Sequence, residues 1–167
     1  PLLAQALEQP FLLEPAKALY GDSALGIATY GASHTGDTGW HVDSPREHPR
    51  EVKFSIYVGP TRAESGALRV WPGSHRSPLH EQARAVVQSG VDDADVPAVI
   101  CPSDPGDVIV FDLRLFHAAL GGAGDRRVIN AFYYADPTTP QEERLVREQI
   151  VADYEWRRDK NRGGRVF

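Results

Sequence analysis

The stretch GWHVDSPREHPREVKFSIYVG, residues 39–59, combines a clear strand pattern with two side chains that suit a metal ion. Its second half alternates apolar and polar residues, the period-2 pattern of a β-strand with two different faces. The apolar set is Val52, Phe54, Ile56 and Val58, and the polar set is Lys53, Ser55 and Tyr57. His41 and Asp43 stand two residues apart, so in an extended segment their side chains project from one face. We therefore expect a strand here, with an imidazole and a carboxylate directed at one object, for which a metal ion is the leading candidate.

The surrounding sequence predicts further strands separated by Gly- and Pro-containing turns. Strands are expected at residues 25–33, 66–75, 108–113 and 126–134, with one edge strand within the loop of residues 91–107. The segment VIVFDL, residues 108–113, is apolar on both faces, so we expect it to be buried on both sides. Helices are expected at residues 2–7, 11–20, 80–90 and 141–161. This pattern predicts a mainly β fold, a sandwich or jelly roll with flanking N- and C-terminal helices.

Length and composition narrow the classes of protein to consider. A chain of 167 residues is expected to form one domain, residues 1–167; it opens on Pro1 and contains no methionine, which leaves open a missing N-terminal portion. The net charge of -5 argues against nucleic acid and against an anionic membrane surface, so we expect a small-molecule partner. No apolar run is long enough to span a bilayer. The single Cys101 has no disulfide partner in the chain, which favours a cytoplasmic protein.

A third metal ligand can be sought among the other histidines. A facial Fe(II) site takes two imidazoles and one carboxylate and leaves its remaining positions open for oxygen and substrates. His117 fits best, because it follows the apolar segment 108–113, and strand ends deliver ligands to a cavity. The weaker candidates, in loops or just past turns, are His34, His48, His75 and His80. A His-x-Asp pair also arises by chance in a chain with six histidines, so these residues alone leave the metal site open.

A series of short motifs in a fixed order carries more weight than any one of them. The motifs are WHVD at residues 40–43, SGAL at 65–68, PGSH at 72–75, GD at 106–107, FH at 116–117 and the arginine pair at 126–127. In this order, residues 25–134 resemble the phytanoyl-CoA dioxygenase (PhyH) family of Fe(II)- and 2-oxoglutarate-dependent oxygenases. The resemblance implies a cupin-like double-stranded β-helix.

The resemblance also implies a reaction and its cofactors. His41, Asp43 and His117 would bind iron, and Fe(II), 2-oxoglutarate and O2 would take part in the reaction. The implied dioxygenase hydroxylates or otherwise oxidises a C–H bond of a small substrate and releases succinate and CO2. Halogenating relatives have a small residue in place of the aspartate, so Asp43 favours hydroxylation over halogenation.

The far carboxylate of 2-oxoglutarate calls for an arginine, whose planar guanidinium binds a carboxylate through two parallel hydrogen bonds. Arg126 and Arg127 both qualify, but they point to opposite faces of one strand. Arg126 is favoured by its spacing to Tyr133, whereas Arg127 lies at the more usual distance after His117. The asparagine that the family commonly has shortly after this histidine is absent, which leaves the registration open. We favour Arg126 and keep Arg127 as the alternative.

The jelly roll also gives a role to the polar face of residues 52–58. The apolar face would pack on helices, and the polar face would line the cavity, where Tyr57 and Ser55 lie beside 2-oxoglutarate. Lys53 would be a buried ammonium, which is costly without an anion. We therefore expect a small substrate with a carboxylate or another anionic group. The alternatives are that this face meets water or that Lys53 extends to solvent at the rim.

Two other functions stay open. A cupin-like metal enzyme that uses no 2-oxoglutarate could share the fold and the ligands, but it would lack a buried arginine opposite the metal. A binding module could keep the fold without the chemistry. Among the remaining residues, Trp40 and Trp71 are expected in the core, and His75 is expected to make structural hydrogen bonds.

Overall fold

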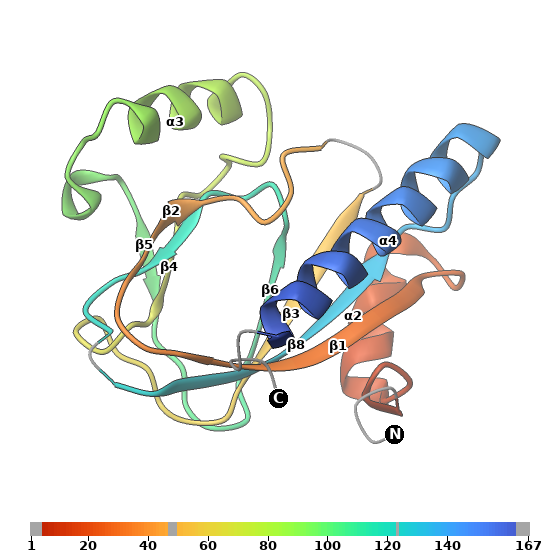
Figure 1. The fold of residues 1–167 in the computed structure, drawn as a ribbon, viewed down its shortest axis with the longest axis horizontal. Coiled ribbons are helices and arrows are strands. Elements are labelled where there is room, and N and C mark those ends of the chain that lie inside the picture. Colours follow the sequence, from red (N-terminus) through yellow and green to blue (C-terminus); the bar gives the residue numbers. More distant parts are fainter. Residues whose placement is uncertain (1–4, 47–49, 123, 163–167) are drawn as a thin grey trace.

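Two antiparallel sheets face each other in the computed structural model of the protein, which describes residues 5–46, 50–122 and 124–162 (Figure 1). Within that part of the chain each sheet has four strands. The main sheet has the order β1 (Leu25–His34), β8 (Arg126–Tyr134), β3 (Glu51–Tyr57) and β6 (Val108–Asp112). The second sheet has the order β2 (Thr38–His41), β7 (His117–Ala119), β4 (Leu68–Val70) and β5 (Val99–Cys101). The predicted jelly roll with flanking helices is confirmed.

Helix α2 (Pro10–Tyr20) covers the outer face of the main sheet (Figure 1). Pro10 occupies its first turn, where a missing N–H costs nothing, and Gly21 ends it with a φ of 86° that suits glycine. Leu12 and Ala16 are fully buried against the sheet. Their sheet partners are Val52, Phe54, Ala131 and Tyr133. The alternation in β3 therefore places its apolar set on the helix side, as predicted.

Helix α3 (Leu79–Gln88), between β4 and β5, belongs to a separate cluster built on the second sheet. Ala83 of this helix packs with Phe116 and Ala118, which flank His117 in the chain. Trp40 and Trp71 belong to the same cluster, and the Trp40 indole donates a hydrogen bond to the carbonyl of Asp93, in the 3-10 helix η1 (Asp93–Asp95), at 3.1 Å. Trp40 thus packs in the core, and the partly buried Trp71 packs against it, beside the strands that carry the histidines.

Helix α4 (Pro140–Arg162) lies on the inner side of the main sheet, at the end of the sandwich away from β5 (Figure 1). Its start is a capping box, in which the Glu142 backbone N–H donates to Thr139 Oγ1 at 3.2 Å and the Thr139 N–H donates to the Glu142 carboxylate at 3.2 Å. Further along, Gln149, Ala152 and Asp153 share a cavity with residues of the main sheet. The C-terminal helix is therefore a wall of the interior, whereas α2 supports the sheet from outside.

Some sequence expectations differ from the structure. Burial of residues 108–113 on both faces is wrong, because β6 is an edge strand and Val110 is 39% exposed. Val58 lies just past β3 and is 44% exposed. The strand expected at 66–75 is only β4, since turns occupy most of the remainder. The helix expected at 2–7 lies largely outside the described residues. No helix of the described part of the chain is long and apolar enough to cross a membrane.

Candidate metal centre

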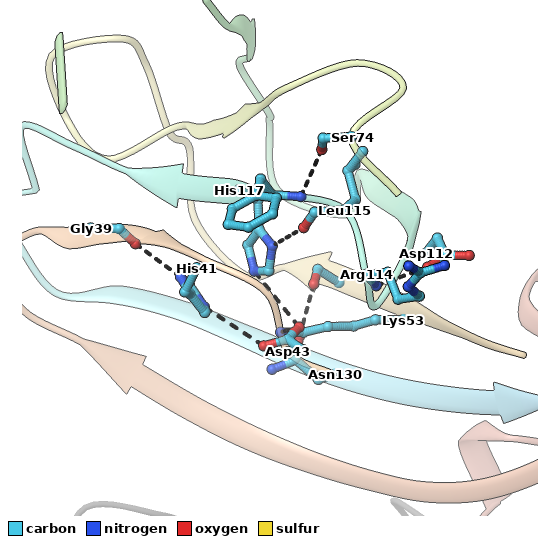
Figure 2. A network of polar contacts seen from close by, with 12 residues as sticks. Gly39, His41, Asp43, Lys53, Ser74, Asp112, Arg114, Leu115, His117 and Asn130 are labelled. Atoms are coloured by element: carbon cyan, nitrogen blue, oxygen red, sulfur yellow. Dashed lines mark hydrogen bonds and ion pairs between the residues drawn. The ribbon is translucent and has the colours of Figure 1, made fainter. Parts of the chain in front are cut away.

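Strand pairing in the second sheet brings two histidines side by side. His41 is the last residue of β2 and His117 the first of β7, and the two are direct partners in the β2–β7 pair. Their ring centroids lie 4.2 Å apart. Asp43 follows β2 by two residues, and its carboxylate oxygens lie 3.7 Å from each histidine Nε2 (Figure 2). The structure therefore brings the three predicted ligands together, with ligand atoms within 4.8 Å of one another.

His117 reaches this place by a different route from the one expected. It does not continue the segment 108–113, which lies in the main sheet. A turn after β6 carries the chain across to the second sheet, where β7 begins at His117. Buried Ser74 supports this crossing, because its hydroxyl accepts a hydrogen bond from the Phe116 N–H at 2.9 Å (Figure 2).

Backbone carbonyls orient both imidazoles. His41 Nδ1 lies 2.9 Å from the Gly39 carbonyl oxygen, and His117 Nδ1 lies 2.8 Å from that of Leu115 (Figure 2). A carbonyl accepts hydrogen bonds, so each Nδ1 carries the proton, and in the neutral ring each Nε2 carries a lone pair. Both Nε2 atoms face Asp43, and the second hydrogen bond of each ring is the support that metal-binding histidines usually have.

The charges at the centre favour a cation. Burial alone would raise the pKa of the Asp43 carboxyl, but the Lys53 ammonium, 2.9 Å away, and the two histidines hold it well below its usual range. Burial lowers the pKa of His117 to about 4 against the attraction of Asp43, so this imidazole is neutral at neutral pH. Burial also acts to lower the pKa of His41, but the nearby Asp43 carboxylate and Gly39 carbonyl outweigh it and raise this pKa. A carboxylate that stabilises a proton on His41 would equally stabilise a divalent metal ion.

Two imidazole nitrogens and one carboxylate oxygen fit a divalent transition metal. Two of the three candidate ligands come from paired strands, and the third, Asp43, is held by Lys53. The three side chains are therefore close to their binding positions before a metal ion arrives. Three protein ligands leave further coordination positions open for small molecules. The donor set therefore fits a catalytic rather than a closed structural site.

A cavity of about 80 Å³ extends from the two histidines between the sheets. Lys53, Ser55 and Tyr57 of β3 line it, and Arg126 of β8 lies on its wall together with Thr38. The Arg126 guanidinium donates to the Gly66 carbonyl at 3.2 Å and to Thr38 Oγ1 at 3.3 Å. These contacts hold it half-buried, and burial lowers its pKa from the ordinary value.

The cavity wall also contains residues that the sequence argument missed. Asn130 of β8 is buried there, and its side-chain oxygen accepts a hydrogen bond from Ser55 at 2.8 Å. It stands four residues after Arg126 on the same face of the strand, so a polar residue at even spacing in RRVINAFYY was the available signal. Burial raises the pKa of Tyr57 to about 12, so its hydroxyl keeps its proton and can donate a hydrogen bond. Nothing in the sequence pattern singled out Thr38.

Other candidates lie elsewhere. Arg127 is exposed, and its guanidinium lies 3.5 Å from the Asp125 carboxylate, outside the cavity. His80 is buried in α3, where it donates to the Ser74 carbonyl at 2.8 Å. His34 is exposed on the cavity rim, and His75 borders a different cavity on the α2 side. No described residue hydrogen-bonds to His75 Nδ1, and the structural hydrogen bond expected of this histidine stays a prediction. His48 lies outside the described residues.

Lys53 does not need an anionic ligand to balance its charge. Its ammonium forms the 2.9 Å ion pair with Asp43 and lies 5.5 Å from the centre of the Phe111 ring. The side chain is 13% exposed, so it neither meets water freely nor extends to the rim. The expectation of an anionic substrate assumed that the metal would take up Asp43; in the absence of a metal Asp43 pairs with Lys53, and the charge of the substrate stays a prediction.

Comparison with known proteins supports the identification of this fold and shows the family of the chain. The family model described as Phytanoyl-CoA dioxygenase (PhyH) matches residues 6–128, more than half of the chain. A search of curated proteins found no match.

Several solved structures share the fold. EvdMO1 is 30% identical with a TM-score of 0.65, and the match covers 80% of this chain but 32% of EvdMO1. HygX from Streptomyces hygroscopicus, solved with iron bound, is 20% identical with a TM-score of 0.63, over 83% of this chain and 68% of HygX. EctD from S. alaskensis, solved with 2-oxoglutarate and 5-hydroxyectoine, is 23% identical with a TM-score of 0.62, over 81% of this chain and 52% of EctD. The chain thus spans about a third of EvdMO1 and about half of EctD.

Proposed function

The chain belongs to the phytanoyl-CoA dioxygenase (PhyH) family, and from this premise we propose that it is an Fe(II)- and 2-oxoglutarate-dependent dioxygenase that oxidises a C–H bond of a small molecule. The observation that carries the proposal is the cavity between the sheets. Its wall holds both the two imidazoles that lie beside Asp43 and the half-buried Arg126. A metal enzyme that uses no 2-oxoglutarate has no need of that arginine, which favours the proposal over the cupin-like alternative.

His41, Asp43 and His117 would hold the iron. Iron with 2-oxoglutarate and O2 supplies the oxidation of a C–H bond, with release of succinate and CO2. Lys53 fixes the orientation of the Asp43 carboxylate, and Phe111 and Ala118 line the cavity with apolar surface that excludes water. Because the aspartate ligand is present, we infer hydroxylation or a related oxidation rather than halogenation.

Arg126 would bind the far carboxylate of 2-oxoglutarate. Its contacts with Gly66 and Thr38 occupy part of the guanidinium and fix its plane, and further N–H donors remain for a carboxylate. Tyr57 has a protonated hydroxyl on the same wall and would donate a hydrogen bond beside it. Arg127, on the outer face of β8, would take no part.

The test is an anaerobic titration of the metal-free protein with Fe(II) and then 2-oxoglutarate. We expect one iron per chain and a visible metal-to-ligand charge-transfer band when 2-oxoglutarate is added. Asp43→Ala should fold normally and lose both iron binding and turnover. Near-normal iron binding by this variant would contradict the ligand assignment.

The two arginines supply a matched pair of variants. Arg126→Ala should weaken 2-oxoglutarate binding by about 2 to 5 kcal/mol, because it removes the cationic partner of a largely buried carboxylate. Arg127→Ala removes the same charge from the outer face and should leave the affinity unchanged. If neither variant weakens 2-oxoglutarate binding while iron still binds, the cosubstrate assignment fails and the metal enzyme without 2-oxoglutarate is favoured.

A further inference from the structure

The peptide group between Leu115 and Phe116 links the metal centre to the turn after β4. Its carbonyl oxygen accepts a hydrogen bond from His117 Nδ1 at 2.8 Å, and its N–H donates to the Ser74 hydroxyl at 2.9 Å (Figure 2). A peptide group is planar and rigid, so these two hydrogen bonds depend on one orientation. The Ser74 hydroxyl therefore holds the plane whose carbonyl orients the His117 imidazole.

Strand pairing does not extend to this peptide group. His117 is the first residue of β7, which is only three residues long, and it pairs with Val70 of β4. The Trp71 N–H reaches the Phe116 carbonyl at 2.9 Å, but that carbonyl belongs to the next peptide group. The strand ladder thus starts beyond the Leu115–Phe116 peptide, and a side chain supplies the partner of its N–H.

Ser74 is itself held in one place. It is fully buried, and its carbonyl accepts a hydrogen bond from His80 Nδ1 at 2.8 Å. His80 is buried in α3, where its Nε2 lies 2.9 Å from Arg84 Nη2 and its ring packs on that of Phe116 with centroids 5.3 Å apart. Because Nδ1 carries the proton, Nε2 has the lone pair that accepts from the arginine. Both ring nitrogens of His80 are therefore satisfied, which favours one fixed position of the turn.

The Ser74 hydrogen bond acts on the imidazole in two ways. The Leu115 carbonyl keeps the proton on His117 Nδ1, which leaves the lone pair of Nε2 for a metal ion. An N–H that donates a hydrogen bond polarises its peptide group, so the carbonyl of the same group becomes a stronger acceptor. Without the hydroxyl, the buried Phe116 N–H would lack this partner, and the peptide would turn toward another acceptor. The carbonyl would then no longer hold the His117 ring.

We propose that Ser74 is a positioning residue for the metal ligand His117 and that it acts through the Leu115–Phe116 peptide group. This inference rests on the proposed function, because a fixed Nε2 lone pair matters only if His117 binds the metal. It assigns the serine of the PGSH turn, residues 72–75, a role at a centre that it does not touch.

The first test is NMR of the imidazole nitrogens in the metal-free protein, with the signals of His117 identified by their loss in His117→Gln. The wild type should show His117 with its proton on Nδ1. Ser74→Ala should shift these signals toward a mixture of the two neutral tautomers. Unchanged His117 signals in folded Ser74→Ala would overturn the proposal.

Ser103→Ala is the matched control. Ser103 is also buried, and its hydroxyl lies 2.8 Å from Thr61 Oγ1, but it does not line the cavity beside the metal centre. This variant loses a buried serine hydrogen bond of the same kind, so it reports the general effect of such a loss. It should leave the His117 signals as they are in the wild type; the same shift in both variants would overturn the proposal.

The second test is a titration with Co(II), which takes the same ligands as Fe(II) and has a visible spectrum. Ser74→Ala should bind Co(II) about tenfold more weakly than the wild type, with an altered spectrum of the bound ion. Ser103→Ala should match the wild type in both respects. Equal affinities of the two variants for Co(II) would contradict the role of Ser74.

Ser74→Cys guards against a misfolded alanine variant. Its side chain has nearly the size of serine, but sulfur is only a weak acceptor, so both readouts should change in the same direction as in Ser74→Ala. If Ser74→Ala does not fold, Ser74→Cys decides the question. A wild-type protein that binds no Co(II) would contradict the proposed function, whereas the metal-free NMR comparison would still test the link between Ser74 and His117.

Discussion

At the scale of single residues, the interior carries more charge than a jelly-roll core needs for stability. Asp43 and Lys53 pair with each other at 2.9 Å, whereas Glu51 is buried, no salt bridge is formed by its carboxylate with a described residue, and burial raises its pKa to about 7. Burying a carboxylate in this way costs free energy unless the group binds a proton. A buried carboxylate with a raised pKa makes the stability of the folded protein depend on pH.

We predict that Glu51→Gln alters the pH dependence of stability. The folded-state pKa of Glu51 is about 7 and its ordinary value is 4.5, so the folded state binds the proton more tightly. The contribution of protonated Glu51 to the free energy of unfolding is fully present below pH 4.5, and it is lost as the pH rises to about 7. The wild type should therefore lose on the order of 3 kcal/mol relative to the variant across this window, at about 1.4 kcal/mol per pH unit.

The measurement is urea unfolding of the metal-free wild type and of Glu51→Gln at several pH values. Glutamine keeps the size of the side chain and cannot titrate, so any pH-independent cost of the substitution cancels in the comparison. Parallel stability curves for the two proteins would mean that the pKa of Glu51 is the same in the folded and unfolded chain.

At the scale of elements, the turn before β4 places the arginine of the cavity. Gly66 has a φ of 84°, which only glycine adopts readily, and a Cβ added there would clash with Arg126 Nη1. The Gly66 carbonyl also accepts a hydrogen bond from the same guanidinium. A turn of the second sheet therefore sets the position of a side chain from the main sheet.

We predict that Gly66→Ala weakens 2-oxoglutarate binding, whereas Gly106→Ala does not. Gly106 has a similar φ of 95°, but a Cβ there would meet nothing within 4 Å. Both variants should lose about 1 to 2 kcal/mol of stability, because alanine is strained at positive φ. Only Gly66→Ala displaces the Arg126 guanidinium, so it alone should reduce the affinity for 2-oxoglutarate, by about tenfold or more.

Calorimetric titration and thermal unfolding of the two variants separate these effects. If Gly66→Ala and Gly106→Ala bind 2-oxoglutarate equally well, the turn does not control the position of Arg126. If only Gly106→Ala weakens binding, the assignment of the cavity itself is wrong.

At the scale of the whole molecule, stability and chemistry lie on opposite faces of the main sheet. The outer face packs on α2 through Leu12 and Ala16. The inner face lines the cavity that contains Arg126 and a second cavity that is shared with α4. Because side chains alternate along a strand, each strand of this sheet serves both faces at once. A change on the outer face can therefore alter stability without touching the site.

We predict that Leu12→Ala lowers the free energy of unfolding by about 2 to 5 kcal/mol, since it leaves a cavity in a fully buried cluster. Leu19→Ala on the same helix is the control, because Leu19 is 53% exposed and its truncation should cost no more than about 0.5 kcal/mol. Well below the unfolding temperature, both variants should bind Fe(II) as the wild type does. Weakened iron binding by folded Leu12→Ala would show that the two faces are coupled.

The sequence by itself determined the local features. The alternation in residues 52–58 specified a two-faced strand, the helix that ends at Gly21 was visible in its composition, and the His41–Asp43 spacing put two candidate metal ligands on one face. Each of these depends on contacts between residues close in the chain, where strand and helix periodicities act directly. The alternation also put Arg126 and Arg127 on opposite faces of one strand, but the structure was needed to show that Arg126 is the one that lines the cavity.

Only the tertiary structure decided how distant segments meet. His41 lies opposite His117 because β2 pairs with β7, and no local pattern states which strands pair. The Asp43–Lys53 ion pair joins the loop after β2 to the main sheet, a contact between residues that no local pattern pairs. The cavity of about 310 Å³ between α4 and the main sheet exists because this helix, which follows the last strand, folds back over Tyr30 and Phe132. Chain folding sets these distances through the packing of whole sheets and helices. The sequence could therefore supply the chemical groups of the site but not their arrangement around it.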